Sequence, residues 1–192
     1  MSRRIAILQG HPDPGGRRFG HALARAYEDG ARSAANEVRV IDIARLDFPV
    51  LRRQDEWQKS TPPRGLAGAQ AAIQWAEHLV LFFPLWLGTM PALLKAFLEQ
   101  ALRPGFALGT QTGWEPLLRG RSARVVVTMG MPALVYRTFF RAHGVKGLES
   151  GILRVCGVRP VRETLIGNVE DCGADKRRIW LARLGALGSA GA

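Results

Sequence analysis

The sequence has few cysteines, and their spacing is not typical of a disulfide framework or a metal site. Only two of the 192 residues are cysteines, Cys156 and Cys172, and they form no C-x-x-C motif. This excludes a small disulfide-stapled scaffold and argues against a zinc centre. No set of His, Asp and Glu residues has the spacing of metal ligands, and no Ser/His/Asp arrangement is indicated. We therefore expect no metal.

Long hydrophobic runs are also absent. No apolar stretch approaches the roughly 18 residues that a membrane-spanning helix needs. Arg3 and Arg4 precede an apolar run that is too short for a secretory signal peptide. We therefore expect a cytoplasmic protein.

Acidic residues are scarce relative to basic ones. The chain has 27 Lys and Arg against 16 Asp and Glu, which gives a formal net charge of +11. A charge of this size raises the question of a nucleic-acid partner. The basic residues are mostly arginines spread along the chain, without an interleaved aromatic platform. This favours a solvated basic surface, so we expect no nucleic-acid partner, although such a surface would attract phosphate-bearing cofactors.

The hydrophobic residues predict five strands that alternate with helices along residues 1–192, which fits a single domain. The expected strands are residues 4–9, 38–43, 79–83, 124–129 and 161–166. Such alternation is typical of a parallel sheet with helices on both faces. Five strands predict an α/β fold with a doubly wound, flavodoxin-like sheet in the order 2-1-3-4-5.

The most informative stretch runs from a buried strand through an apolar loop into a helix. Residues 79–83 are all apolar, as in a strand covered on both faces. We expect pairing to stop at Pro84, which has no N–H, and a helix to start at Pro91. The loop between the two prolines contains Trp86, at the edge of the sheet where ligands bind. Trp86 indicates either a flat, apolar ligand or a side chain packed under its own loop.

Two further loops follow predicted strands and contain Gly and Pro, at residues 10–19 and 129–136. The first leads into a helix that begins at Phe19, and the unpaired N–H groups of a helix start favour an anion. Arg17 and Arg18 would strengthen a phosphate site there. Neither the P-loop pattern nor G-x-G-x-x-G is present. In the predicted strand order these two loops converge with residues 84–90 at one switch point.

Other segments are less regular. Residues 49–63 form a charged, Pro-rich stretch with Trp57, which suggests a surface arm, a lid or part of an interface. Residues 136–142 and 145–155 are predicted to be helical, with a break near His143 and Gly144.

The stretch from Phe83-Pro84-Leu85 through Pro91-Ala92-Leu93-Leu94-Lys95 resembles the flavin loop of NAD(P)H:quinone oxidoreductases of the DT-diaphorase type. The family includes bacterial modulators of drug activity and potassium-efflux accessory oxidoreductases. Four other segments resemble the same family: residues 10–14 with Phe19, residues 47–51, residues 128–130 with Tyr136, and residues 150–157. The resemblance covers nearly the whole chain.

The resemblance implies a noncovalently held flavin, FAD or FMN, and two-electron reduction by NADH or NADPH. By position it assigns the flavin phosphate and tail to His11, Arg18, Phe19 and Gly20. It assigns the ring system to two further groups: Pro84, Leu85, Trp86 and Leu87 on one side, and Thr128, Gly130 and Tyr136 on the other edge. It also implies catalytic roles for Tyr136 and for His143.

Three positions depart from the family pattern. Arg18 stands where the family usually has Ser or Thr before the Phe, so the phosphate grip would rely on a guanidinium. Leu87 and Gly88 stand where an aromatic residue is frequent, which implies a more open pocket wall. The family's catalytic His falls on Ala142 here, with His143 one residue later.

We therefore predict a flavin-dependent NAD(P)H oxidoreductase that reduces quinone-like acceptors by a ping-pong hydride mechanism. An azo- or nitro-reductase with the same cofactor is an alternative. A second alternative is a low-turnover, flavin-binding regulatory subunit of a membrane transport system, which would have a peripheral membrane partner. A nucleic-acid binder driven by the charge is a third.

We also predict a homodimer with the active site near the interface. Four aromatic residues fall in predicted loops: Trp57, Trp86, Phe106 and Trp114. Exposed apolar patches mark interfaces, and the resembled family is dimeric.

Overall fold

The computed structural model describes residues 2–58, 61–110 and 115–192. Five strands form one sheet in the order β2-β1-β3-β4-β5, and each neighbouring pair is parallel. They are β1 (Arg4–Gln9), β2 (Glu37–Asp42), β3 (His78–Pro84), β4 (Ser122–Thr128) and β5 (Val161–Ile166). The predicted flavodoxin-like sheet and its strand order are confirmed.

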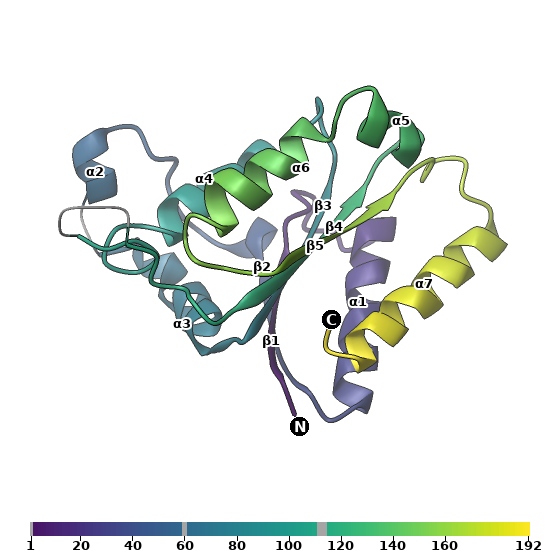
Figure 1. The fold of residues 1–192 in the computed structure, drawn as a ribbon, viewed down its shortest axis with the longest axis horizontal. Helices are drawn as coiled ribbons and strands as arrows, with labels where there is room; N and C mark the ends of the chain where they lie inside the picture. Colours follow the sequence, from purple (N-terminus) through teal and green to yellow (C-terminus); the bar gives the residue numbers. More distant parts are fainter. Residues whose placement is uncertain (1, 59–60, 111–114) are drawn as a thin grey trace.

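Helices cover both faces of the sheet, as Figure 1 shows. One face carries α1 (Phe19–Ser33) and α7 (Ala174–Ser189), and the other carries α3 (Ala67–Trp75), α4 (Ala92–Ala101) and α6 (His143–Leu148). The connections contain α2 (Gln54–Gln58), α5 (Ala133–Thr138), 3-10 turns at Ile43–Arg45 and Arg64–Leu66, and a π-helical turn at Glu149–Leu153. Within the described ranges, no helix has the length and apolarity required of a transmembrane segment.

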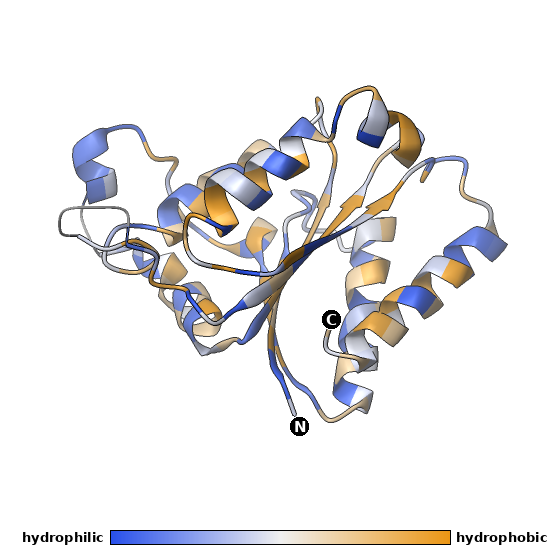
Figure 2. Cartoon of the chain, viewed as in Figure 1, coloured by the Kyte–Doolittle hydropathy of each residue, from blue (hydrophilic) through white to orange (hydrophobic). Residues whose placement is uncertain are grey.

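The central strands are apolar on both faces because each contributes to two cores. In β3, Val80 and Phe82 pack with α1 and α7, whereas Leu79, Leu81 and Phe83 pack with α3 and α4. Figure 2 shows the hydrophobic residues along these strands and mixed stripes on the helices. Cys156 is buried in the core on the side of α3 and α4, and burial raises the pKa of its thiol to about 11.

The end of β3 differs from the prediction, because Pro84 still pairs with Thr128 of β4. The next residue continues the pairing, with the Leu85 N–H donating to the Thr128 carbonyl at 2.7 Å. Pairing of β3 with β1 ends earlier, at Phe82 and Gln9. We infer that the N–H missing from Pro84 lies on the side of β1, where no strand needs it.

The helical break after β4 also lies elsewhere than predicted. It falls at residues 139–142, between α5 and α6, where Arg141 and Ala142 have positive φ angles of 51° and 50°. Gly144 lies inside α6 and allows close packing. A Cβ on Gly144 would lie 2.2 Å from the carbonyl oxygen of Gly88, so only glycine fits there.

The described parts of the Pro-rich stretch, residues 49–58 and 61–63, are anchored to α4 and to Arg103 just after it. The Gln100 side chain donates to the Pro49 carbonyl at 2.7 Å, and the buried Arg103 donates to the carbonyls of Glu56 and Thr61. Trp57 packs partly buried against the core.

A pH test of stability follows from His78 at the start of β3. His78 is buried, and burial lowers its pKa to about 3 from 6.5. Below pH 6.5 the unfolded chain therefore binds a proton at His78 that the folded chain does not bind. The free energy of unfolding consequently falls as the pH drops. We expect His78 to cost about 2 kcal/mol of unfolding free energy between pH 7.5 and pH 5.

Urea unfolding of wild type and of His78→Asn at the two pH values measures this cost. The variant should lose less stability on acidification than wild type. His143→Asn, at an exposed histidine, is the matched control. An equal acid loss in His78→Asn and wild type would contradict the prediction.

Candidate functional site

A cavity of about 710 Å³ lies at the carboxyl edge of the sheet. Four connections line it, those that follow β1, β3, β4 and β5. Its lining includes nine of the residues predicted for the cofactor: His11, Arg18, Phe19, Gly20, Pro84, Leu85, Trp86, Thr128 and Gly130. The predicted convergence of the loops is therefore present in the structure.

The first loop is held by short-range hydrogen bonds. The N–H of His11 donates to the Gln9 side chain at 3.1 Å, and the N–H of Asp13 donates to Nδ1 of His11 at 3.0 Å. The N–H of Gly15 donates to the Asp13 carboxylate at 2.8 Å. These bonds fix the path of the loop from the end of β1 to the start of α1.

Gly10 marks a close approach at the base of this loop. Its N–H donates to the Phe82 carbonyl at 2.7 Å. A Cβ at this position would lie 2.8 Å from a methyl group of Leu94 and 3.1 Å from the Phe82 oxygen. Glycine therefore lets the loop cross directly over β3 and α4.

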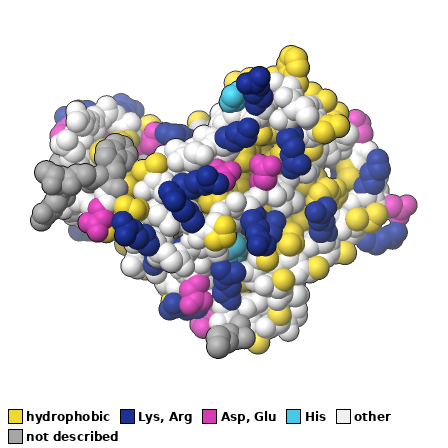
Figure 3. Space-filling model, viewed as in Figure 1, with side chains coloured by type: hydrophobic (Ala, Val, Ile, Leu, Met, Phe, Trp, Pro, Cys, Tyr) yellow, Lys and Arg dark blue, Asp and Glu magenta, His cyan; other side chains and the backbone are white. Residues whose placement is uncertain are grey.

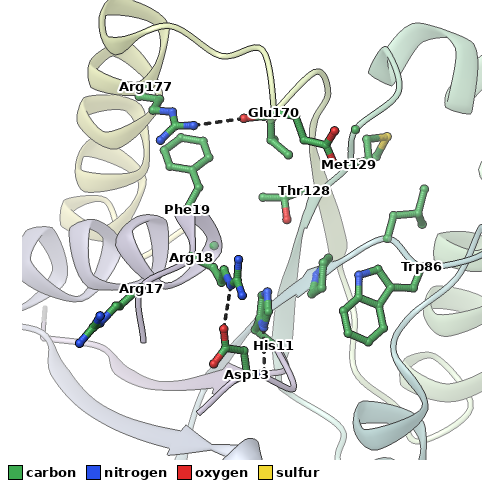
Figure 4. Close-up of a pocket in the computed structure, with 15 residues that line it drawn as sticks. His11, Asp13, Arg17, Arg18, Phe19, Trp86, Thr128, Met129, Glu170 and Arg177 are labelled. Carbon is green, nitrogen blue, oxygen red and sulfur yellow. Dashed lines mark hydrogen bonds and ion pairs between the residues drawn. The ribbon is translucent and has the colours of Figure 1, made fainter. Parts of the chain in front are cut away.

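The start of α1 offers an anion site at one end of the cavity. Arg18 precedes the helix in an extended conformation, and no side chain caps the helix. The first N–H groups of a helix have no intrahelical acceptors, and with the helix dipole they favour a negative charge. Arg17, Arg18 and Arg177 border the cavity at this end (Figure 4).

Arg18 already has a partner within the loop. Its Nε lies 2.7 Å from a carboxylate oxygen of Asp13. This contact, with the N–H of Gly15, holds the pKa of the Asp13 carboxyl below its usual range. An anion at the helix start would therefore meet a guanidinium that Asp13 partly neutralises.

The fourth connection brings residues that the sequence analysis did not predict. Val169, Glu170 and Arg177 line the cavity after β5. Arg177 lies over the Phe19 ring at 5.5 Å from its centroid and donates to the Cys172 carbonyl at 2.8 Å. The predicted strand order could have indicated these residues, because β5 is parallel to β4 and must end at the same edge of the sheet.

The other end of the cavity is apolar, with Pro84, Leu85, Trp86 and Met129. Figure 4 shows Trp86 well separated from the arginines. Trp86 is 51% exposed, so it is not packed under its own loop, and its contact with a flat ligand stays a prediction. Trp86 and Thr89 form two backbone hydrogen bonds, and the tip residues Leu87 and Gly88 have positive φ angles of 47° and 79°.

One histidine, His11, lines the cavity, and the buried His21 lies next to it. The His11 ring lies 6.3 Å from Trp86 in an edge arrangement and 4.9 Å from His21, measured between ring centroids. Burial, followed by the mutual proximity of the two rings, lowers the pKa of His11, and burial also lowers the pKa of His21. His11 therefore favours its neutral form at the cavity wall.

Three of the predicted site residues do not line the cavity. Leu87 projects fully into solvent at the loop tip. His143 is exposed and borders a separate apolar groove. Tyr136 is buried, with its hydroxyl donating to the Gly88 carbonyl at 3.0 Å and accepting from the Val145 N–H at 3.3 Å. Their roles in binding or catalysis stay predictions.

The fold and the cavity define a class: proteins with a flavodoxin-like fold and a cavity at the switch point of the sheet. Residues 3–185 match the protein family described as having a flavodoxin-like fold, and the chain belongs to this family.

Known relatives agree with this assignment. An uncharacterized NAD(P)H oxidoreductase of Haemophilus influenzae is 28% identical over 92% of this chain and 90% of its own. The ribosyldihydronicotinamide dehydrogenase [quinone] of Pongo abelii is 25% identical over 95% and 90% of the two chains. An FMN-dependent NADH-azoreductase of Bacillus anthracis, solved with FMN, has a TM-score of 0.76 at 14% identity, over 97% and 98%. The predicted family and the predicted class of enzyme, an oxidoreductase, are confirmed.

The pairing of Asp13 with Arg18 generates a prediction about anions. Asp13→Asn keeps an oxygen for the Gly15 N–H but removes the charge beside Arg18. Because the exposed Asp13 carboxylate no longer competes with the anion for the Arg18 guanidinium, we expect inorganic phosphate to bind about twofold more tightly.

Titration calorimetry with phosphate at low salt measures this change. Glu99→Gln removes an ion pair with Lys95 outside the cavity and should leave phosphate affinity unchanged. Weaker or unaltered binding in Asp13→Asn would contradict the electrostatic account of the helix start.

Proposed function

We propose that the protein is a flavin-dependent NAD(P)H oxidoreductase that reduces quinone-like acceptors by two electrons. The observation that carries the proposal is one cavity with a helix start and three arginines at one end and an apolar aromatic wall at the other. This combination suits a ligand with a phosphate and a flat ring system. A volume of about 710 Å³ lies within the usual range of cofactor sites.

The residues present fit a flavin. The first-turn N–H groups of α1, with Arg17, Arg18 and Arg177, would hold its phosphate, and Pro84, Leu85 and Trp86 would cover its ring system. Thr128 and Gly130 would provide a hydroxyl and a backbone N–H at the other edge. The chemistry that such a group supplies is the exchange of two electrons and a proton between a nicotinamide and an acceptor. The relative solved with FMN supports a flavin, and our proposal includes FMN and FAD alike.

The chain itself would bind and orient the flavin and the substrates, and it would exclude water from the site. Trp86, Leu85 and Met129 provide an apolar surface on which a nicotinamide or a quinone could stack. One such surface would serve the reductant first and the acceptor second, which favours ping-pong kinetics. The relative named for quinone supports this acceptor class, and the azoreductase of the same fold keeps azo compounds as a second candidate.

We further propose that residues 1–192 form one domain and that two copies form a dimer. The aromatic argument for a dimer now rests on Trp86, since Trp57 and Phe106 pack against the core and Trp114 lies outside the described residues. A second observation supports the dimer. A groove of about 630 Å³ between α4 and α6 is mostly apolar, with Lys95, Glu99 and His143 at its border. Sedimentation velocity at micromolar concentration tests the dimer, and a monomer alone would contradict it.

The function is tested by releasing the bound flavin, identifying it as FMN or FAD, and adding NADH or NADPH without oxygen. We expect rapid loss of oxidised flavin absorbance, turnover with quinones, and parallel double-reciprocal lines. A protein that neither carries nor takes up flavin would overturn the proposal. Reduction without appreciable turnover would favour the regulatory subunit.

Arg177→Gln adds a site-specific readout to that experiment. Loss of a hydrogen bond to a charged group should weaken flavin binding about tenfold or more. Lys176→Gln changes the neighbouring residue, which does not line the cavity, and is the matched control. Equal flavin affinities in the two variants would remove Arg177 from the site.

The roles of Tyr136 and His143 are tested separately, by stopped-flow reduction of flavin-loaded Tyr136→Phe and His143→Gln. Loss of one hydrogen bond costs on the order of 1–3 kcal/mol, so we expect Tyr136→Phe to be reduced about tenfold more slowly. Because the Tyr136 hydroxyl holds the Trp86 loop, the unfolding midpoint is measured alongside. Slow reduction at an unchanged midpoint supports catalysis, and slow reduction with a lowered midpoint supports positioning. Wild-type rates in both variants would exclude both residues.

A further inference from the structure

Three arginines gather on the side of the sheet that faces α1 and α7. Arg124 of β4 pairs in register with Arg162 of β5, so both side chains leave the sheet on the same face. That face is the one on which Val126 packs with α1 and α7. Arg183 of α7 lies close enough for its charge to act on Arg124. We call Arg124, Arg162 and Arg183 the basic cluster, and Figure 3 shows basic side chains near the centre of the view.

Arg124 is buried and has no acidic partner among the described residues. It is 7% exposed, its Nη1 donates to the Thr164 hydroxyl at 2.8 Å, and its Nε has no hydrogen-bond partner. Burial lowers the pKa of its guanidinium, and the other groups that act on this pKa are Tyr27, Arg162 and Arg183. None of the ion pairs in the described chain involves the basic cluster. Arg124 is therefore a buried positive charge that the chain does not neutralise, which is costly.

His78 adds a second unpaired nitrogen beside Arg124. It is buried at the start of β3 and pairs in register with Ser122, two residues before Arg124 in β4. Arg3 donates to the Ser122 hydroxyl, and the hydroxyl oxygen lies 2.8 Å from His78 Nδ1, to which it can donate its own proton. Because burial lowers the pKa of His78 to about 3, the imidazole is neutral and carries its proton on Nε2. This Nε2 is buried and has no hydrogen-bond partner.

The two unpaired N–H groups make the interior behind the basic cluster electropositive. In native structures almost every buried donor has a partner, so these exceptions indicate a partner from outside the chain. A water molecule would accept hydrogen bonds but would leave the charges unbalanced. An oxyanion meets both needs, because its oxygens match the planar fork of a guanidinium. Three positive charges favour a doubly charged oxyanion, such as phosphate or sulfate.

We propose that the basic cluster binds an oxyanion of the phosphate class between β5 and α7. Nη2 of Arg124 donates to it, since this nitrogen has no hydrogen bond in the described chain and is not among the buried unpaired atoms. Arg162 and Arg183, both exposed, close over it from the sheet and from the helix. The site lies apart from the flavin cavity, because Thr128, which lines that cavity, is about 13 Å further along β4. The inference does not rest on the proposed function.

Such an ion holds α7 against the sheet. The helix packs chiefly on α1, and Arg183 is the residue that it contributes to the basic cluster. An oxyanion shared by the three guanidiniums binds the folded chain alone, so it raises the temperature of unfolding. The proposal therefore has a readout that needs no enzyme activity.

Thermal unfolding of the flavin-loaded protein in rising phosphate, at an ionic strength held constant with sodium chloride, tests the site. We expect the unfolding midpoint of wild type to rise and then to saturate. Arg124→Gln should weaken phosphate binding at least about tenfold, because it removes a hydrogen bond to a charged group. General stabilisation by excluded salts does not saturate and acts on both proteins alike. Equal rises in the two proteins would show an adventitious ion only and would overturn the proposal.

The midpoint without phosphate separates binding from a purely structural role. Arg124→Gln then removes an unbalanced buried charge, so the variant should unfold at or above the wild-type temperature. A midpoint lowered by the same amount at every phosphate concentration would assign Arg124 to the packing of β4 and overturn the proposal. Arg124 does not line the flavin cavity, so the comparison holds for the flavin-free protein too.

The exposed arginines give variants that leave the core intact. Arg162→Gln and Arg183→Gln should each weaken phosphate binding about twofold. Arg178→Gln, on the same helix but at an arginine paired with Asp175, is the matched control and should leave phosphate affinity unchanged. An equal effect of all three substitutions would show that only the net charge matters, and would overturn the proposal.

The source of the oxyanion and its position are determined separately. Tighter binding of glycerol 3-phosphate than of inorganic phosphate would support an oxyanion carried by an organic molecule, and the reverse order would support the free ion. Anomalous scattering from a crystal of the flavin-loaded protein soaked in selenate gives the position. We expect a selenate within hydrogen-bond distance of Arg124, and selenate bound elsewhere but not there would overturn the proposal.

Discussion

Two backbone hydrogen bonds continue the sheet beyond its strand ends, and the site depends on them. The N–H of Gly10 reaches the Phe82 carbonyl, and the N–H of Leu85 reaches the Thr128 carbonyl, both at 2.7 Å. Each joins a loop to the neighbouring strand just where that loop leaves the sheet. The loops after β1, β3 and β4 are thereby fixed relative to one another, and the cavity lies between them. The requirement for glycine at position 10 follows from the same contact.

The two ends of the cavity differ in charge and polarity. The uncapped start of α1 and three arginines make one end favourable for an anion, while Asp13 moderates the charge of Arg18. Trp86 stands at the other end on a tight turn that keeps its indole half exposed. The same turn presents Leu87 to solvent. Tyr136 connects that loop to α5, because its hydroxyl donates to the Gly88 carbonyl.

The sheet could be predicted from the sequence because its signals are local. An all-apolar run such as residues 79–83 and the alternation of strands with helices leave few topologies. Nine of the predicted cofactor residues line one cavity, since strand order alone brings their loops together. The sequence-based predictions were wrong at positions where the local structure depends on neighbouring strands and loops. Pro84 continues the strand because β1 has already ended, and Gly144 packs against Gly88 instead of breaking a helix.

Side-chain direction was the least predictable feature. Tyr136 follows the third loop as expected, but its hydroxyl is used by the Gly88 carbonyl and the Val145 N–H, which no spacing rule reveals. The pairing of Asp13 with Arg18 likewise depends on how the loop folds back on itself. Arg177 is far from the other site residues in sequence and reaches the cavity only because α7 packs beside α1.

The central claim is that one cavity holds a flavin with its phosphate at the start of α1 and its ring system beside Trp86. A crystal structure of the protein with its bound flavin tests this most directly. The account predicts phosphate oxygens against the N–H groups of the first turn of α1 and near Arg177, with the rings beside Trp86. A flavin bound in the groove between α4 and α6, or with its phosphate away from α1, would contradict the account.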